Sequence, residues 1–256
     1  MNILTISNQK GGVAKTTTAA ALWAGLNMRG YKTLAIDLDP QRNFSDGVGA
    51  DESKTAFGVL TGEVTAAEAV QTVGGFDIIA GAGMLAAAES VLTETGKECR
   101  LKEALEPLKK KYDYCIIDTP PSLNVLTVNA LTATDGVIVP VQADLFSING
   151  LTKLYLTVEA VRKYFNPGLQ IEGVLLTKYK PRANMSREIM KILQDSAERL
   201  DTKIYKTAIR ESIKAAEAPA QRQAVIQAFP RSTVAEDYNS LIDEITAERT
   251  PQDNEQ

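Results

Sequence analysis

Residues 8–18, Asn-Gln-Lys-Gly-Gly-Val-Ala-Lys-Thr-Thr-Thr, lie between an apolar stretch typical of a strand and an alanine-rich stretch typical of a helix. Two adjacent glycines let backbone N–H groups close around an anion, and the N-terminus of the following helix adds partial positive charge. In such a loop a lysine reaches the β- and γ-phosphates and a hydroxyl group holds Mg²⁺. A glycine-rich turn without a ligand is the simpler alternative, but the flanking elements favour phosphate binding. We expect nucleotide contacts from Gly11, Gly12, Val13, Ala14, Lys15, Thr16 and Thr17.

Two further apolar stretches end in acidic residues. Residues 33–37 end in Asp37, and Asp39 follows two positions later, so alternation places both carboxylates on the same side of the strand end. Residues 114–118 end in Asp118, the pattern of a strand whose terminal carboxylate binds Mg²⁺ directly or through water. Ligands of parallel sheets bind outside the carboxyl ends of the strands, where these acids emerge. We therefore predict that Asp118 and Thr16 bind Mg²⁺ and that Asp39 faces the nucleotide; a simple turn role before Pro40 is the alternative for Asp39.

Apolar runs of four to eight residues alternate with helical patterns along the chain, which indicates a parallel sheet with crossover helices. We predict an α/β fold with a doubly wound, mostly parallel sheet and helices on both faces. A single domain is expected at residues 1–249, followed by a polar, disordered tail at 250–256. The predicted strands cover 3–7, 33–37, 76–80, 114–118, 136–141, 173–177 and 203–207, and the predicted helices 17–28, 101–110, 146–165, 186–200 and 234–246.

Composition narrows the possible chemistry. The chain has no histidine, which excludes histidine-based catalysis and the commonest metal ligand. Its two cysteines, Cys99 and Cys115, form no CxxC metal motif and no disulfide framework, and Cys115 is expected to be a buried free thiol. The sequence shows no signal peptide and no apolar run of the roughly 18 residues that a membrane helix needs, so we expect a cytoplasmic protein.

Charge is unevenly distributed along this chain of formal net charge -4. Residues 178–231 contain 12 Lys+Arg and 6 Asp+Glu, whereas residues 232–256 contain 1 basic and 7 acidic residues. A basic segment within an acidic protein is what local attraction to nucleic-acid phosphates requires. Ordinary solvated helix faces are the alternative explanation.

The loop departs from the general P-loop pattern, because Asn8 replaces its first glycine, Ala14 its last, and Lys10 is additional. With these residues the chain resembles the deviant Walker A ATPases, which include partition ATPases, cell-division site-selection ATPases and nitrogenase iron protein. The resemblance implies that Lys10 crosses an ATP-sandwiched homodimer to contact the partner subunit's phosphates, and that Asp39 orients or deprotonates the attacking water. It thereby implies catalytic roles for Lys10, Lys15 and Asp39. A solvated loop lysine is the alternative for Lys10.

Within this group the chain is similar to ParA/Soj-type partition ATPases over most of its length. The matching segments are Asp37-Leu-Asp-Pro-Gln-Arg-Asn, Asp118-Thr-Pro-Pro-Ser-Leu, Ile138-Val-Pro-Val-Gln, Leu175-Leu-Thr-Lys-Tyr, Asn184-Met-Ser-Arg-Glu, Glu217-Ala-Pro, Pro230-Arg-Ser and Ala235-Glu-Asp-Tyr. The resemblance implies Mg²⁺ and ATP as cofactors, slow hydrolysis, a ParB-like activator, non-specific DNA as a partner, and a nucleoid-associated protein in the cytoplasm that segregates plasmid or chromosomal DNA. Candidate DNA contacts are Arg187, Lys191, Lys214 and Arg231.

Two single positions and one loop depart from that family. Ala14 and Arg42 replace glycines, and Ile209-Arg-Glu-Ser replaces the usual Ile-Pro-Arg-Asn of a loop near the adenine. We hypothesise that Ala14 remodels the loop and slows nucleotide exchange. The substitutions in the 209–212 loop put base contacts from that loop in question.

Several other functions fit the same fold. A MinD-like membrane ATPase would need a basic amphipathic C-terminal helix, but the tail here is acidic and polar, so no membrane partner is expected. A nitrogenase-like reductase would need loop cysteines for an iron–sulfur cluster, but Cys115 lies within a predicted strand. An ATP-dependent ligase, an ATPase that positions another cargo, and a nucleotide-gated DNA-binding scaffold with negligible hydrolysis remain alternatives.

Overall fold

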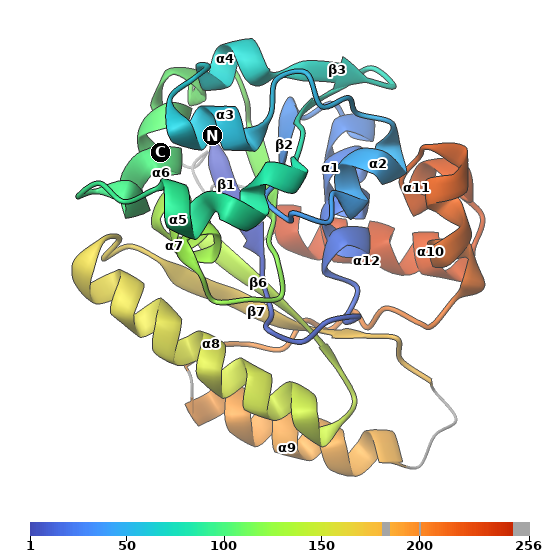
Figure 1. Ribbon diagram of the computed structural model, residues 1–256. Coiled ribbons are helices and arrows are strands. Elements are labelled where there is room, and N and C mark those ends of the chain that lie inside the picture. The colour runs from blue at the N-terminus through green and yellow to red at the C-terminus, as the bar shows by residue number, and fades with distance from the viewer. Residues whose placement is uncertain (181–184, 200, 248–256) are drawn as a thin grey trace, which may run out of the picture.

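The computed structural model describes residues 1–180, 185–199 and 201–247; the side chains of 145–149, 185–190 and 199 are outside this description. The described strands form one sheet in the order β3-β4-β2-β5-β1-β6-β7 (Figure 1). All neighbouring strands are parallel except β3 and β4, which are antiparallel. The strands are β1 (Asn2–Ile6), β2 (Thr33–Asp37), β3 (Gln71–Val73), β4 (Phe76–Ile79), β5 (Tyr114–Asp118), β6 (Gly136–Gln142) and β7 (Gln170–Thr177).

Helices cover both faces of the sheet, as predicted (Figure 1). One face carries α1 (Lys15–Met28), α11 (Val225–Ala228) and α12 (Thr233–Ala247). The other carries α3 (Ala56–Thr61), α6 (Arg100–Leu105) and α7 (Val125–Ala133), with α8 (Leu145–Tyr164) and α9 (Met185–Arg199) beside β6 and β7. Shorter helices are α2 (Asn43–Val48), α4 (Ala66–Ala69), α5 (Ala88–Val91), α10 (Ile213–Glu217) and the 3₁₀ segments Gly83–Ala87, Lys97–Cys99, Glu106–Leu108 and Ala218–Gln221.

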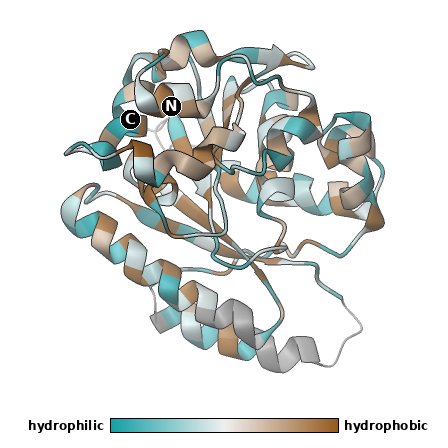
Figure 2. Ribbon diagram, viewed as in Figure 1, coloured by the Kyte–Doolittle hydropathy of each residue, from teal (hydrophilic) through white to brown (hydrophobic). Residues whose placement is uncertain are grey.

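Alternation along the buried strands divides the core between the two faces. Ile116 packs with the α1 side and Ile117 with the α6 side, as successive residues of a strand must. Both sides of the central strands are therefore apolar, and Figure 2 shows hydrophobic residues along the strands between the helices. On the α1 side Trp23 packs edge-on against Phe44 and Phe76, and its indole donates to the Asp77 carbonyl (2.9 Å).

The predicted strands 33–37 and 114–118 match β2 and β5, and the other predicted strands and the long helices differ mainly at their ends. The predicted strand at 203–207 is wrong: the Tyr205 N–H donates to the Val174 carbonyl of β7 and the Val174 N–H donates to the Lys203 carbonyl, which gives only an isolated bridge between Val174 and Ile204. Strand β3 and helices α7, α10 and α11 were not predicted. Residues 250–256, predicted to be a disordered tail, are outside the described residues.

The register of the central strands sets the position of the site. Asp37 at the end of β2 pairs with Asp118 at the end of β5, and Asp118 also pairs with Ile6 at the end of β1. The chain then leaves β1 into the loop that leads to α1. The two acids and the glycine-containing loop therefore meet at one edge of the sheet.

Candidate active site

The loop between β1 and α1 has the open backbone that a phosphate site requires. Gly12 has φ 74°, and a Cβ placed on Gly11 or Gly12 would have no neighbour within 4 Å. Ala14 also has a positive φ, 65°, and precedes the first residue of α1. An alanine in this conformation costs about 1 kcal/mol relative to glycine. The loop therefore keeps a glycine-like shape at Ala14 despite its side chain.

Side-chain hydrogen bonds fix this loop to the neighbouring strand β6. Asn8, which is buried, donates through its amide to the Pro140 carbonyl of β6 (2.6 Å) and accepts from the Lys10 N–H (3.0 Å). From the end of β6, Gln142 donates to the Gly12 carbonyl (2.8 Å). Asn8 at the first loop position thus has a structural role that a glycine could not perform.

The two lysines of the loop have different surroundings. Lys15 is buried, with 7% of the residue exposed, and its ammonium donates to the Lys10 carbonyl (3.1 Å). Burial lowers the pKa of Lys15, while Asp118 and Asp39 act to raise it. Lys10 is more exposed, and its ammonium forms an ion pair with Asp144 of the same chain (2.5 Å). Lys15 therefore points into the site, and Lys10 lies at its rim.

Asp118 is fully buried, and neither of its carboxylate oxygens has a hydrogen-bond partner among the described residues. Burial and then Asp37 raise the pKa of Asp118 well above its usual value, while the nearby Thr16 hydroxyl and Lys15 act to lower it. A buried carboxylate without a partner is costly unless a cation neutralises it. Carboxylate and hydroxyl oxygens are the ligands that Mg²⁺ prefers, so Asp118 and Thr16 fit a Mg²⁺ site.

Asp37, the last residue of β2, and Asp39, two residues later, have different surroundings. Asp37 is fully buried and accepts hydrogen bonds from the Asp39 N–H (3.0 Å), the Ser45 N–H (3.0 Å) and the Ser45 hydroxyl (2.7 Å). Burial raises the pKa of Asp37 to about 6, although these hydrogen bonds oppose the rise. Asp39 lines the cavity next to the loop, and one of its oxygens accepts from the Gln41 N–H (2.9 Å). Asp39 therefore both stabilises the turn that follows it and lines the cavity.

A cavity of about 1100 Å³ joins these residues to the C-terminal half of the chain. Its walls include Lys15, Thr16 and Asp39 on one side and the segment 209–216 on the other. Within that segment Arg210, which also lines the cavity, forms a two-point contact with Asp237 of α12 (2.6 and 2.9 Å). Several lining residues were not predicted as site residues from the sequence: Gln41, Asn43, Asp46, Pro121, Lys178, Ala215 and Tyr238. Of these, Gln41, Asn43, Pro121, Lys178 and Tyr238 lie in segments that carry the family resemblance, which is the signal that could have identified them.

The candidate DNA contacts do not form one patch. Lys191 is exposed on α9, whereas Lys214 lies on α10 and Arg231 just before α12, at a different part of the molecule (Figure 1). Lys214 forms an ion pair with Glu217 (2.6 Å) and its ammonium lies 4.6 Å from the centre of the Phe229 ring. The side chain of Arg187 is outside the described residues. No helix in the described part of the chain is long and apolar enough to cross a bilayer.

The parallel sheet, the loop between β1 and α1, and the acids that end β2 and β5 together define a P-loop nucleoside triphosphatase. A family model described as "AAA domain" matches residues 1–171. Among solved structures, a cobyrinic acid a,c-diamide synthase from Mycobacterium smegmatis with bound ATP analog and magnesium is 33% identical, with a TM-score of 0.84 over 97% of this chain and 96% of that one. Apo McdA from Cyanothece is 25% identical, with a TM-score of 0.86 over 96% and 99% of the two chains.

Relatives of known name indicate which family of P-loop nucleoside triphosphatases the chain resembles. The sporulation initiation inhibitor protein Soj of Bacillus subtilis is 41% identical over 251 residues, which cover 96% of this chain and 98% of Soj. The chromosome partitioning protein ParA of Caulobacter vibrioides is 42% identical over 234 residues, covering 88% and 86% of the two chains. The chain belongs to the Soj/ParA family of partition ATPases.

Proposed function

We propose that this chain binds ATP with Mg²⁺, forms an ATP-dependent homodimer that binds DNA without sequence preference, and releases DNA when a ParB-like partner stimulates hydrolysis. The observation that carries the proposal is the buried, unpartnered Asp118 carboxylate beside Lys15 and Thr16, two residues that line a cavity together with Asp39. Mg²⁺ would supply the positive charge that the Asp118 carboxylate lacks, and the nucleotide phosphates would supply the negative charge that the Lys15 ammonium faces.

Each residue of the site has a defined task in the proposed reaction. Lys15 offsets the charge of the β- and γ-phosphates, and its burial strengthens that interaction. Asp118 and Thr16 hold Mg²⁺, which when bound neutralises charge on the phosphate oxygens. Asp39 orients the attacking water, because its carboxylate lies at the cavity and is fixed by the Gln41 N–H. Lys10, at the rim, contacts the nucleotide of the partner subunit.

The proposed DNA contacts come from the basic segment 178–231, and they imply association with the nucleoid. Contacts to phosphates release counterions, so affinity falls steeply as salt rises. The test is binding to random-sequence duplex DNA with ATP, with ADP and without nucleotide, across a salt titration. We expect binding with ATP alone and a steep decrease with salt. Absence of binding in all three states would contradict the proposal and favour an ATPase that positions another cargo.

The same assay addresses the alternative of a scaffold with negligible hydrolysis. An Asp39→Ala variant should remain bound to DNA after ATP is added, because release requires hydrolysis. If wild type and the variant release DNA at the same rate, hydrolysis does not drive release and the scaffold alternative is favoured.

A further inference from the structure

Arg42 has an unusual backbone conformation at the point where the chain turns from Asp39 into α2. Its φ is 57° and its ψ is 21°, in the left-handed region that a residue with a large side chain rarely adopts. The turn is closed by a hydrogen bond from the Arg42 N–H to the Asp39 carbonyl (2.9 Å). Such a conformation persists where surrounding contacts hold it, and it is found preferentially at functional sites.

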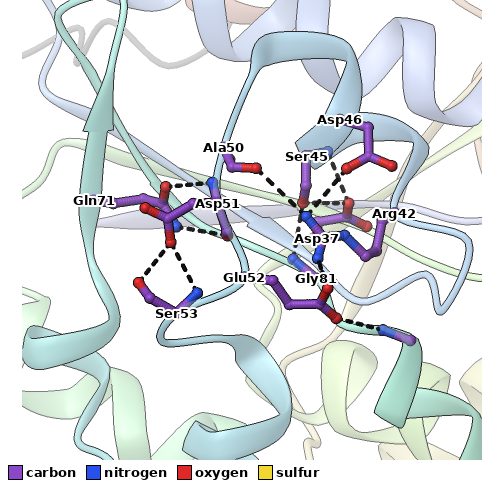
Figure 3. Close-up of polar contacts among 11 residues, drawn as sticks. Asp37, Arg42, Ser45, Asp46, Ala50, Asp51, Glu52, Ser53, Gln71 and Gly81 are labelled. Carbon is purple, nitrogen blue, oxygen red and sulfur yellow. Dashed lines mark hydrogen bonds and ion pairs between the residues drawn. The ribbon is translucent and has the colours of Figure 1, made fainter.

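The guanidinium group of Arg42 is largely enclosed by one loop and one helix. Only 13% of its side chain is exposed. It forms ion pairs with Asp46 of α2 (3.1 Å) and with Glu52, and it donates to the Ala50 carbonyl (3.4 Å) (Figure 3). Arg42 therefore connects the Asp39 turn to the loop that follows α2.

That loop is itself fixed to the edge of the sheet. Asp51 and Gln71 of β3 exchange two hydrogen bonds, from the Asp51 N–H to the Gln71 amide oxygen (2.9 Å) and from the Gln71 amide to the Asp51 carbonyl (3.1 Å) (Figure 3). Glu52 accepts from the Gly83 N–H (3.1 Å) through the oxygen that does not face Arg42. Arg42 thus contacts a loop whose position is fixed by residues outside the 39–42 turn.

A second set of hydrogen bonds, centred on Asp37, holds the segment 39–45 at its two ends, Asp39 and Ser45, but not at its middle. Asp37 accepts from the Asp39 N–H and from Ser45, and the Ser45 hydroxyl accepts from the Gly81 N–H (2.8 Å). The five residues between Asp39 and Ser45 include Gln41, whose N–H donates to the Asp39 carboxylate. Arg42 is the residue in this stretch whose side chain reaches the 50–52 loop.

We propose that Arg42 is a positioning residue for Asp39: its contacts to Asp46, Ala50 and Glu52 hold the 39–42 turn in the conformation that presents the Asp39 carboxylate to the attacking water. This inference rests on the proposed role of Asp39. Replacing Arg42 should therefore lower the rate of ATP turnover more than it lowers the free energy of unfolding. The ion pairs involve partners that are half exposed or more, so they contribute little to folding, and glycine would relieve the left-handed conformation.

The test compares Arg42→Gly with Arg222→Gly in the full chain. Arg222 is also an arginine with a positive φ, 52°, but it is exposed and, among the described residues, its side chain forms no ion pair or hydrogen bond with the 50–52 loop, so its replacement controls for lost charge and relieved strain. We expect Arg42→Gly to lower kcat by roughly tenfold while KM for ATP stays within about twofold, because the catalytic group loses its position and the phosphate loop is intact. Arg42→Lys should recover part of kcat.

Hydrogen exchange, thermal unfolding and a Glu52→Gln variant distinguish a role of Arg42 in positioning Asp39 from a role in folding. Without nucleotide, amide hydrogen exchange at Gln41 should accelerate in Arg42→Gly and not in Arg222→Gly, while the thermal midpoint of unfolding stays close to that of wild type. Glu52→Gln, which keeps an acceptor for the Gly83 N–H, should lower kcat in the same direction as Arg42→Gly. Unchanged kcat in Arg42→Gly, or a rise in KM in its place, would overturn the inference.

Asp39→Ala distinguishes a failure of this inference from a failure of the proposed function. If Asp39→Ala hydrolyses ATP like wild type, the proposed role of Asp39 is wrong and Arg42 has nothing to position. If Asp39→Ala is inactive and Arg42→Gly is fully active, only the role of Arg42 is wrong.

Discussion

One residue of the phosphate loop, Ala14, has a backbone conformation that is unfavourable for its side chain. Ala14, at φ 65°, precedes α1, and the Thr18 N–H donates to its carbonyl (2.9 Å), so the first turn of the helix depends on this geometry. The conformation costs an alanine about 1 kcal/mol more than a glycine. The sequence identified Ala14 as a departure from the family pattern, but only the structure shows that its φ is positive.

Ala14→Gly should therefore raise the free energy of unfolding by up to about 1 kcal/mol, with part of the gain offset by the greater freedom of glycine in the unfolded chain. Urea denaturation without nucleotide measures this directly. The hypothesis that Ala14 slows exchange also predicts faster release of bound ADP from the variant. A lower urea midpoint would contradict the argument from strain, and unchanged ATP affinity and ADP release would contradict the argument from exchange.

At the scale of secondary structure, continuous apolar runs predicted the buried parallel strands well, because strands covered on both faces must be apolar throughout. The segment 203–207 was wrongly predicted as a strand: Tyr205 is buried against β7, yet few backbone groups of the segment pair with that strand. Strand β3 has three residues, and its hairpin depends on Gly74 and Gly75, both with positive φ. Neither feature follows from hydrophobic periodicity alone.

Contact between Tyr205 and β7 gives a prediction at this scale. A Cβ on Gly173 would lie 2.8 Å from the Tyr205 ring, which is buried and has little room to move. Gly173→Ala should destabilise the protein by about 1–3 kcal/mol through overpacking. Gly168→Ala is the matched control, since its Cβ would meet only the Asn166 amide oxygen at 3.8 Å. Thermal unfolding of both variants measures the effect. Adding Gly173→Ala to a Tyr205→Leu background should lower the stability less than adding it to the wild-type protein, because the leucine leaves room for the methyl group.

At the scale of the whole molecule, motifs predicted the wall of the cavity formed by the phosphate loop and Asp39, with Asp118 buried beside Lys15 and Thr16. The opposite wall, formed by 209–216 and Tyr238, depends on how the C-terminal half folds back over the loop, and local sequence does not specify such long-range contacts. The Asp37–Ser45–Gly81 connection likewise joins residues that only the strand order brings together. The same limit applies to Asp144, which lies after β6 and meets Lys10 across the fold.

The ion pair between Lys10 and Asp144 leads to a prediction about assembly. Both side chains are about 30% exposed, and pairs of this kind contribute no more than about 1 kcal/mol, so the pair can open when a partner subunit offers phosphate charge to Lys10. In an Asp39→Ala background with Mg²⁺ and ATP, Lys10→Ala should remain monomeric at concentrations where the parent dimerises, yet still bind ATP through Lys15. Asp144→Asn, which removes the intrachain partner but leaves the lysine, should dimerise at the same or lower concentration than the parent. Sedimentation velocity measures both. Dimerisation of Lys10→Ala equal to that of the parent would show that Lys10 acts within its own subunit and not across the interface.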